Sequence, residues 1–317
     1  MLIGIGMRIA AAFAFAIMAT LAKLTNGGYS IGQIVFFRSL FALAVLVLWL
    51  RARGDFPRAI YTKRPLGHLA RGTGGTGGMF SYFLAVALLP LPDVTAIGYL
   101  APLLVVALAA VVLGETVRVY RWSAVAIGFV GVLVMVSEHL GQGSGSRVGA
   151  LAALSSAAFA AYAVIQTRRL AQSETTGAIV FYFSVLTSAF GFLLMTAGYF
   201  WPHEAPLGDF LAGQKWATPG WLDLALLIGV GLFGGVGQIL MTDCVRYADA
   251  SVIAPFEYTS IVFAMALGWF VFAEKPTTPI LVGSAIVIAA GLFVLWREHK
   301  LGLIRIRPQT AGAERTV

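Results

Sequence analysis

The ten residues "SIGQIVFFRS" (residues 30–39) recur 145 positions later as "TTGAIVFYFS" (residues 175–184). The two copies share five pairs, which are Gly32/Gly177, Ile34/Ile179, Val35/Val180, Phe36/Phe181 and Ser39/Ser184. Internal repetition on this scale predicts that the chain is built from two related halves.

A second part of each half recurs with a larger offset of 159 residues. It pairs Tyr99 with Tyr258, Glu115 with Glu274, and Gly78 with Gly237. The change of offset reflects the longer connection at residues 201–220 of the second half. The repetition therefore extends over most of the chain.

The composition is that of a membrane protein. Of the 317 residues, 59% are apolar and 11% are charged, whereas an ordinary soluble domain is roughly 25% charged. Apolar runs fall at residues 4–24, 31–50, 67–89, 92–113, 121–138, 147–168, 177–200, 221–246, 250–272 and 279–296. Each is near the ~20 residues that a helix needs to cross ~30 Å of hydrocarbon. The sequence predicts an all-α membrane protein with ten transmembrane helices.

Five spans fall in each half, residues 1–140 and 147–296, and residues 297–317 form a tail. Because five is odd, the second half must enter the membrane in the opposite orientation. Such inverted repeats commonly place a substrate site near the midplane and expose it to the two sides in turn. The pattern thus predicts two inverted five-helix repeats and transport by alternating access.

Basic residues define the expected orientation. The net charge is +8, and the runs "RARGDFPRAIYTKR" (51–64) and "WREHKLGLIRIR" (296–307) would suggest nucleic-acid contacts in a soluble protein. Here they lie between or after apolar spans, so we interpret them as topology signals and expect no nucleic-acid partner. With the N-terminus inside, most basic residues fall on the cytoplasmic side, Arg71 being assigned to the connection after the second span. We expect both termini in the cytoplasm of a bacterial-type inner membrane.

The glycine-rich stretch "ARGTGGTGGMF" (70–80) matches the G-x-G-x-x-G pattern of a phosphate-binding loop, with Asp93 at the distance of a ribose-binding carboxylate. The stretch lies inside a predicted span, however, with no strand before it. Gly74/Gly78 and Gly231/Gly235 each have the G-x-x-x-G spacing that lets helix backbones approach closely. We therefore predict helix packing and no nucleotide.

Several features together resemble one known family. They are the ten spans in two halves, "FFR" at 36–38, the small-residue third span, "LPLPDVTAIGYLAPLLVVALAAVVLGE" at 89–115 and "YADASVIAPFEYTSIVFAMALGWFVFAEK" at 247–275. This layout resembles the EamA type of the drug/metabolite transporter superfamily. The resemblance implies a ten-span transporter, and members carry amino acids, nucleosides, vitamins or drugs in either direction. The layout is similar to members that take up riboflavin or S-adenosylmethionine.

Arg38 and Glu257 lie deep within spans, where a charge costs about 2.5–3.5 kcal/mol on insertion scales and indicates a functional site. Arg38 could bind an acceptor on the substrate or gate the outer path, or it could act as a structural clasp on helix-end carbonyls. Glu257 could bind substrate or carry a coupling proton, and its counterpart in the repeat is Gly98. Both lie in the middle third of the membrane, so a direct ion pair between them is possible.

Aromatic and polar side chains within spans complete the candidate substrate site. Tyr99, Tyr258, Phe37, Tyr82 and Gln238 could stack on a planar ring and bind its polar groups. The alternative for most aromatics is ordinary packing or lipid contact. Pro102 and Pro255 could kink the fourth and ninth spans and free backbone carbonyls. Glu115 and Glu274 are expected to stabilise the amide ends of the helices that follow them.

Enzyme classes find no support in the sequence. The chain has no Walker motif, no clustered nucleophile and base, a single cysteine and four scattered histidines, so we expect no catalytic residue, no metal and no cofactor. The sequence predicts a secondary transporter whose partners are a small-molecule substrate, the lipid bilayer and a possible coupling proton. The first substrate candidate is a ring-bearing vitamin or cofactor such as riboflavin. The alternatives are S-adenosylmethionine or a nucleoside, or export of amino acids or drugs.

Overall fold

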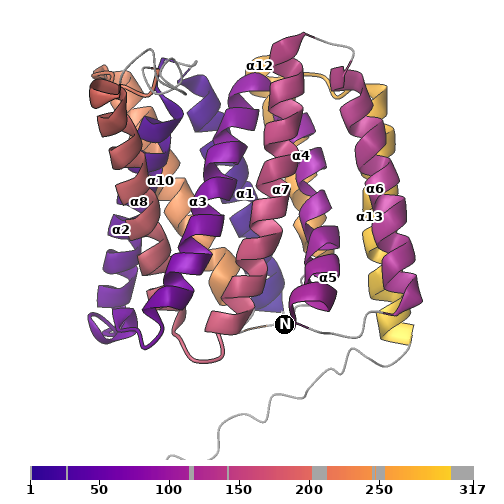
Figure 1. Cartoon of the computed structure of the whole chain (residues 1–317), viewed down its shortest axis with the longest axis horizontal. Coiled ribbons are helices and arrows are strands. Elements are labelled where there is room, and N and C mark those ends of the chain that lie inside the picture. The colour runs from indigo at the N-terminus through magenta and orange to yellow at the C-terminus, as the bar shows by residue number, and fades with distance from the viewer. Residues whose placement is uncertain are drawn as a thin grey trace, which may run out of the picture.

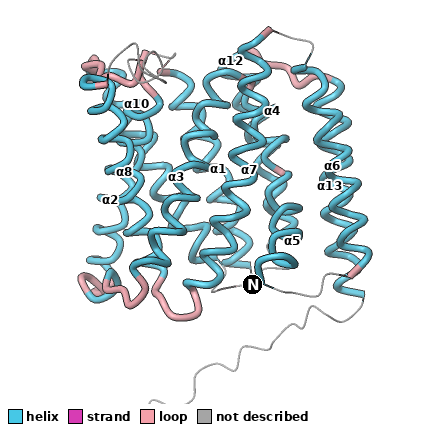
Figure 2. Tube along the Cα trace, in the orientation of Figure 1, coloured by secondary structure: helices cyan, strands magenta, loops and turns pink. Residues whose placement is uncertain are grey.

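The computed structural model describes residues 2–25, 28–113, 118–140, 143–201, 213–244, 247 and 254–300. Within these ranges the chain is helical and contains no strand (Figure 2). The α-helices are α1 (Leu2–Leu24), α2 (Ile31–Ala52), α3 (Pro65–Leu88), α4 (Leu91–Gly98), α5 (Leu100–Leu113), α6 (Val119–Leu140), α7 (Ser144–Leu170), α8 (Thr176–Phe200), α10 (Trp221–Asp243), α12 (Thr259–Phe272) and α13 (Thr278–Lys300). Two short 3₁₀ segments are η1 (Arg58–Ile60) and η3 (Ala254–Tyr258).

These elements make ten passes of a bundle in the described part of the chain (Figure 1). Eight passes are single helices, and two are interrupted, namely α4 with α5 and η3 with α12. By length and composition, seven segments are apolar enough to cross a membrane. The predicted all-α membrane fold is confirmed, because each predicted span corresponds to one pass.

The repeated ten-residue stretch begins a helix in both halves for the same local reason. Ser30 and Thr175, which are equivalent residues, each precede a helix and accept a hydrogen bond from a backbone N–H three residues on. The distances are 3.2 Å to Gln33 N and 3.0 Å to Ala178 N. A side-chain oxygen at this position satisfies an otherwise unpaired amide of the first turn. The repeat therefore sets the start of α2 and α8.

Helix directions and neighbours follow the inverted repeat. In Figure 1, α1 rises from the end that carries the N-terminus, whereas α7, the first helix of the second half, descends toward that end. The equivalent helices α2 and α8 pack together, as do α6 and α13. The first helix of each half packs on the third helix of the other, α1 on α10 and α7 on α3. The halves are thus intertwined around an approximate two-fold axis.

Glycines allow the closest of these approaches. A Cβ atom at Gly74 would overlap the Tyr162 ring, and one at Gly78 would lie 3.2 Å from Phe159 Cβ, so both glycines lie against α7. On the equivalent helix α10, a Cβ at Gly231 would lie 2.9 Å from the carbonyl oxygen of Phe37 in α2. A Cβ at Gly235 would lie 2.8 Å from Ala42 Cα, also in α2. The glycine-rich stretch is helical throughout.

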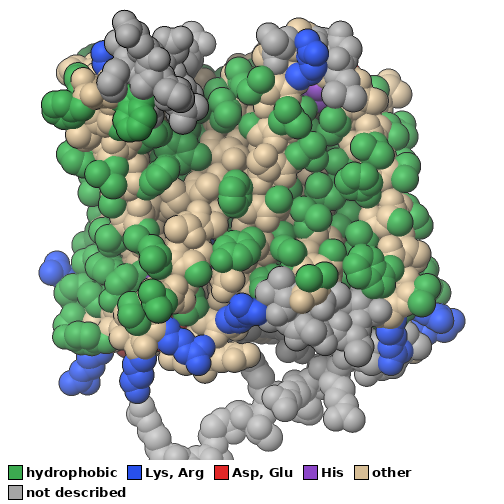
Figure 3. Space-filling view, viewed as in Figure 1, with side chains coloured by type: hydrophobic (Ala, Val, Ile, Leu, Met, Phe, Trp, Pro, Cys, Tyr) green, Lys and Arg blue, Asp and Glu red, His purple; other side chains and the backbone are tan. Residues whose placement is uncertain are grey.

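Charged and apolar side chains occupy different parts of the surface. Apolar side chains cover the flank of the bundle, and Lys and Arg gather at the end that carries the N-terminus (Figure 3). The exposed basic residues of that end come from the last turn of α2, the α2–α3 connection and the ends of α7 and α13. They are Arg51, Arg53, Arg58, Lys63, Arg64, Arg168, Arg169 and Lys300.

Candidate functional site

Two passes are interrupted at equivalent positions near the centre of the bundle. Helix α4 ends at Gly98 and α5 begins at Leu100. Pro102 lies in the first turn of α5, and a proline ring clashes with the carbonyl four residues earlier, here that of Gly98. In the other half, Pro255 lies in the 3₁₀ segment η3, and α12 begins after Tyr258. Each interruption leaves backbone groups that other parts of the protein must satisfy.

Tyr99 and Tyr258 lie at these interruptions and contact each other. Their ring centroids are 5.1 Å apart with an interplanar angle of 70°, an edge-to-face arrangement. The Tyr99 hydroxyl accepts a hydrogen bond from Ile261 N at 2.9 Å and lies 2.8 Å from Ser260 Oγ. It also lies 3.2 Å from the carbonyl oxygen of Tyr258. The side chain of one half therefore caps the helix that begins in the other half.

Glu257 is paired, but not with Arg38. Its Oε1 lies 2.6 Å from Arg8 Nη2, and the two side chains are 39% and 14% exposed, respectively. Arg8 comes from α1, so the pair links the first helix to η3. The direct ion pair between Glu257 and Arg38 that the sequence left possible is therefore not formed, and Arg8 is a partner that the sequence analysis did not name.

Arg38 lies instead against an aromatic ring. Its side chain is buried, with 2% of the residue exposed, and its Cζ lies 5.6 Å from the centroid of Phe183 in α8. Phe183 is the residue equivalent to Arg38 at the 145-residue offset. No carboxylate of the described ranges lies within 4.0 Å of the Arg38 guanidinium.

A second buried arginine faces the same ring. Arg71 is 9% exposed, and its Cζ lies 4.0 Å from the Phe183 centroid. Its Nε donates to Thr167 Oγ1 of α7 at 3.3 Å. The assignment of Arg71 to the connection after the second span is wrong, because the residue lies in the second turn of α3. The position of Arg71 inside the apolar run 67–89 is the sequence feature that indicates a place within the helix.

Equivalent glycines give the two guanidinium groups their room. A Cβ at Gly75 would overlap Arg71 Nη1 and lie 2.6 Å from Phe183 Cε2. A Cβ at Gly234, which is equivalent to Gly75 at the 159-residue offset, would lie 3.0 Å from Arg38 Nε. Each half thus contributes one glycine that leaves space for a guanidinium group, Gly75 for Arg71 and Gly234 for Arg38.

The other aromatic candidates lie in two neighbouring core clusters. Phe37 is buried beside Phe41 and Trp216, with centroids 6.0 and 5.7 Å away. Tyr82 is half-buried and packs against both the cluster that contains Phe37 and the cluster that contains Tyr99. Gln238 is half-buried, and its Nε2 lies 3.4 Å from Thr242 Oγ1 of the same helix. Tyr82 therefore lies between the two regions, whereas the hydrogen bond of Gln238 stays within its own helix.

Polar pairs that the sequence did not reveal join helices near the end of the bundle opposite the N-terminus. Lys23 of α1 binds Glu274, which follows α12, and Glu274 Oε2 accepts from Leu91 N at 3.0 Å. Asp93 of α4 lies 3.3 Å from His139 Nε2 of α6. Glu274 therefore stabilises the amide end of α4, not that of the helix that follows it, which corrects the expectation. Glu115 lies outside the described residues.

At the other end, Glu174 links the α7–α8 connection to α3. Its side chain is 2% exposed, its Oε1 accepts from Lys63 N at 3.0 Å, and its Oε2 lies 3.5 Å from His68 Nε2. Burial alone would raise the pKa of the Glu174 carboxyl, but hydrogen bonds from Lys63, His68 and Thr62 lower the pKa below its ordinary value of 4.5. The carboxylate is therefore held in its charged form.

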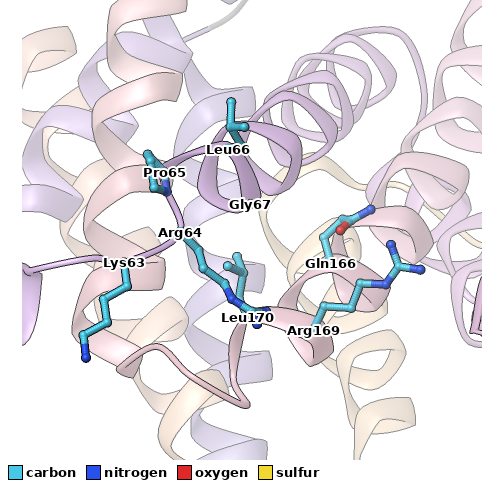
Figure 4. Close-up of a pocket in the computed structure, with 8 residues that line it drawn as sticks. All are labelled: Lys63, Arg64, Pro65, Leu66, Gly67, Gln166, Arg169 and Leu170. Carbon is cyan, nitrogen blue, oxygen red and sulfur yellow. The ribbon is translucent and has the colours of Figure 1, made fainter.

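A cavity of about 380 Å³ opens beside this linkage, between the start of α3 and the end of α7 (Figure 4). Its lining includes Lys63, Arg64 and Arg169 as well as Gly67 and Gln166. Figure 4 shows the Arg64 and Arg169 side chains on either side of Leu170. The lining of the cavity is therefore partly basic.

Comparison with known proteins identifies the family. The model of the EamA-like transporter family matches residues 2–137 and again residues 147–296. The chain belongs to this family. The two matches cover the two five-pass halves, and EamA-like proteins are transporters, so the chain is a multi-pass membrane transporter and not an enzyme.

Relatives of this chain include proteins named for three different solutes. The S-adenosylmethionine uptake transporter of Rickettsia prowazekii is 26% identical over 268 residues, which are 84% of this chain and 84% of the relative. The pseudopaline exporter CntI of Pseudomonas aeruginosa is 28% identical over 288 residues, 90% of this chain and 94% of the relative. The riboflavin transporter of Brucella anthropi is 27% identical over 287 residues, which are 90% of this chain and 95% of the relative. The relatives differ in both solute and direction.

The fold is also found in a crystal structure. That structure superposes with a TM-score of 0.64 over 94% of this chain and 97% of its own, at 20% sequence identity. The similarity shows that the ten-pass arrangement is shared.

In the described residues, no group of three or more His, Cys, Asp or Glu side chains could hold a metal ion.

Proposed function

We propose that this protein is a secondary transporter of the bacterial inner membrane that moves a small, ring-bearing organic solute by alternating access. The observation that carries the proposal is the contact of two interrupted passes at equivalent positions, Tyr99 with Tyr258. In transporters built from inverted repeats, interrupted helices at the repeat interface commonly form the solute site. Rocking one half against the other would then expose this region to each side.

The proposed orientation rests on charge. The end of the bundle that carries the N-terminus also carries the clustered Lys and Arg side chains (Figure 3). Short connections rich in Lys and Arg remain on the cytoplasmic side. We therefore place this end, and with it both termini, in the cytoplasm.

The solute is a proposal at the level of class. Aromatic rings at Tyr99, Tyr258, Tyr82 and Phe37 favour a planar ring. Riboflavin remains the first candidate from the sequence, and S-adenosylmethionine or a nucleoside is the alternative. Export of an amino acid or drug is compatible with the same site, because the relatives include both uptake proteins and an exporter.

Transport into proteoliposomes tests the proposal. The full chain would be reconstituted and supplied with radiolabelled riboflavin, S-adenosylmethionine, adenosine and aromatic amino acids, with and without a pH gradient. We expect one solute to accumulate and to equilibrate when the gradient is removed. If no solute enters and preloaded liposomes retain every solute, alternating-access transport of this class is contradicted.

Glu257 is the proposed site of proton coupling. Glu257→Gln should retain exchange of labelled for unlabelled solute but lose accumulation driven by the pH gradient, because exchange needs no net proton movement. Asp55→Asn is the matched control, since it removes an exposed carboxylate of the α2–α3 connection. Equal accumulation by Glu257→Gln and wild type would refute the coupling role.

A further inference from the structure

We propose that Arg38 of α2 and Arg71 of α3, which both contact the Phe183 ring of α8, bind a carboxylate of the transported solute beside that ring. The inference rests on the proposed transport function and narrows its solute class. It concerns the negative charge of the solute, whereas the aromatic cluster around Tyr99 concerns the planar ring of the solute.

The first observation is a set of buried donors without acceptors. Arg38 Nε and Nη1 and Arg71 Nη1 are buried and have no hydrogen-bond partner in the part of the chain that the structure describes. The two residues are 2% and 9% exposed. Buried guanidinium groups are ordinarily paired, because an unpaired buried N–H or charge is costly. Three donors from two arginines therefore point to an acceptor that the described part of the chain does not supply.

The second observation is that the two cations share one neighbour. Their Cζ atoms lie 5.6 and 4.0 Å from the centroid of the Phe183 ring, and the two guanidinium groups repel each other. Contact with an aromatic face compensates a cation only in part. An oxyanion between two arginines removes the repulsion and accepts charge-assisted hydrogen bonds, for which the planar guanidinium is well suited.

The third observation is that the scaffold makes space for this arrangement. Gly75 and Gly234 occupy equivalent places in α3 and α10, and a Cβ at either would press on one of the guanidinium groups. Thr167 holds Arg71 Nε from α7, which leaves its Nη1 for another acceptor. The two arginines therefore come from different helices and are positioned by both halves of the repeat.

A basic cavity lies one helical turn from Arg71, at one end of the bundle. The cavity of Figure 4 is lined by Gly67, one helical turn before Arg71, and by Gln166, the neighbour of the Thr167 that binds Arg71. Lys63, Arg64 and Arg169 are the basic residues of its lining. Clustered charges of one sign raise the local concentration of oppositely charged solutes. The cavity would thus guide an anionic group toward Arg71.

The inference separates the solute candidates. S-adenosylmethionine and amino acids carry a carboxylate, whereas riboflavin and nucleosides do not. The structure therefore favours an amino-acid or amino-acid-like solute with a ring. It also gives Arg38 a partner residue in solute binding, which the sequence could not supply.

Ligand protection of the purified full chain tests the site directly. The thermal midpoint would be measured with two matched pairs, tryptophan against tryptamine and S-adenosylmethionine against its decarboxylated analogue, and with riboflavin, acetate and chloride. Wild type should be protected by a carboxylate-bearing member and at least about 30-fold less well by its decarboxylated partner, since losing a buried charge partner typically costs this much affinity. Arg38→Met and Arg71→Met should each abolish that preference.

The unliganded variants distinguish binding from a structural role. Because both cations lack a carboxylate partner in the described ranges, Arg38→Met should melt no lower than wild type without ligand. Arg58→Met, on an exposed connection residue, is the matched control and should retain the preference. Arg38→Lys keeps the charge in case the methionine variant folds poorly. A large loss of stability in both Arg38 variants would instead indicate a clasp and overturn the inference.

The remaining outcomes are equally decisive. Equal protection by both members of each pair would overturn the inference, because the site would not select for a carboxylate. Full protection by acetate or chloride alone would also overturn it, because a small resident anion would then be the partner of the arginines. Protection of wild type by no carboxylate would also overturn it. If liposomes still transport riboflavin in that case, the proposed transport function stands and only the carboxylate site fails.

Discussion

The Tyr99 hydroxyl of one half accepts the backbone N–H of Ile261 in the other half, 2.9 Å away, while the Tyr99 ring lies edge-on to that of its counterpart Tyr258. Ile261 lies in the first turn of α12, where backbone amides lack helical acceptors. An interrupted helix in one repeat is therefore capped by the interruption of the other. This contact couples the two halves at the place where an alternating-access transporter must change conformation.

Removing this hydroxyl should destabilise the protein. Tyr99→Phe keeps the ring contact but leaves Ile261 N and Ser260 Oγ without this partner, and loss of a helix cap or buried hydrogen bond costs about 1–2 kcal/mol. We expect a lower thermal midpoint in detergent. Tyr258→Phe is the matched control, since its hydroxyl makes no hydrogen bond to the described part of the chain. Equal midpoints for the two variants would contradict the capping role.

The Arg8–Glu257 pair should contribute modestly, because Glu257 is 39% exposed. Pairs with such exposure are typically worth about 0.2–1 kcal/mol. Arg8→Gln and Glu257→Gln should each lower the free energy of unfolding, and the double variant should lose less than the sum. A double-mutant cycle from denaturant unfolding in mixed micelles measures this coupling. Strict additivity would show that the pair contributes nothing.

Glycine substitutions should rank by what the added Cβ meets. Gly231→Ala meets the Phe41 side chain and the Phe37 backbone carbonyl, which cannot rotate away, so it should lose the most stability, about 1–3 kcal/mol. Gly74→Ala meets the Tyr162 ring and should lose less. Gly6→Ala meets nothing within 4 Å and should be neutral or stabilising. Thermal midpoints of the three purified variants check the order, and a destabilised Gly6→Ala would show that helix packing does not explain it.

Glu174 should make stability depend on acid pH. Its folded pKa lies below its ordinary value of 4.5, so its stabilising contribution is complete above that value and disappears as the pH falls through the folded pKa. Glu174→Gln should therefore melt lower than wild type at pH 7, and the difference between the two variants should shrink as the pH falls below 4.5. Thermal midpoints measured from pH 3 to pH 8 give the difference directly. A gap that is constant across this range would exclude the carboxylate as its cause.

The number, order and direction of the passes could be read from the sequence. Apolar length decides where a helix can cross a membrane, because every backbone group must be satisfied inside the segment. The duplicated stretch at residues 30–39 and 175–184 and the odd number of spans then require opposite orientations. Local caps at Ser30 and Thr175 fix the same helix starts in both halves.

The candidate site was only partly accessible from the sequence. The repeat shows that Tyr99 and Tyr258 are equivalent, and only the structure shows that they touch. Likewise, Arg38 stood out as a charge within a span, whereas Arg71 was hidden near a basic connection until α3 placed it beside Phe183. Glu257 pairs with Arg8 because α1 packs against η3.

One physical reason separates what the sequence determines from what only the tertiary structure decides. Span formation and orientation depend on hydropathy, capping and connection charge, which are properties of contiguous residues, so the sequence by itself determined the ten-pass inverted architecture. Which side chains meet depends on how each helix is rotated about its axis and how closely its neighbours approach. Those quantities are set by packing between distant segments, such as Gly231 against α2 and Gly75 beside Phe183. Only the tertiary structure, therefore, decided that two buried arginines share one ring.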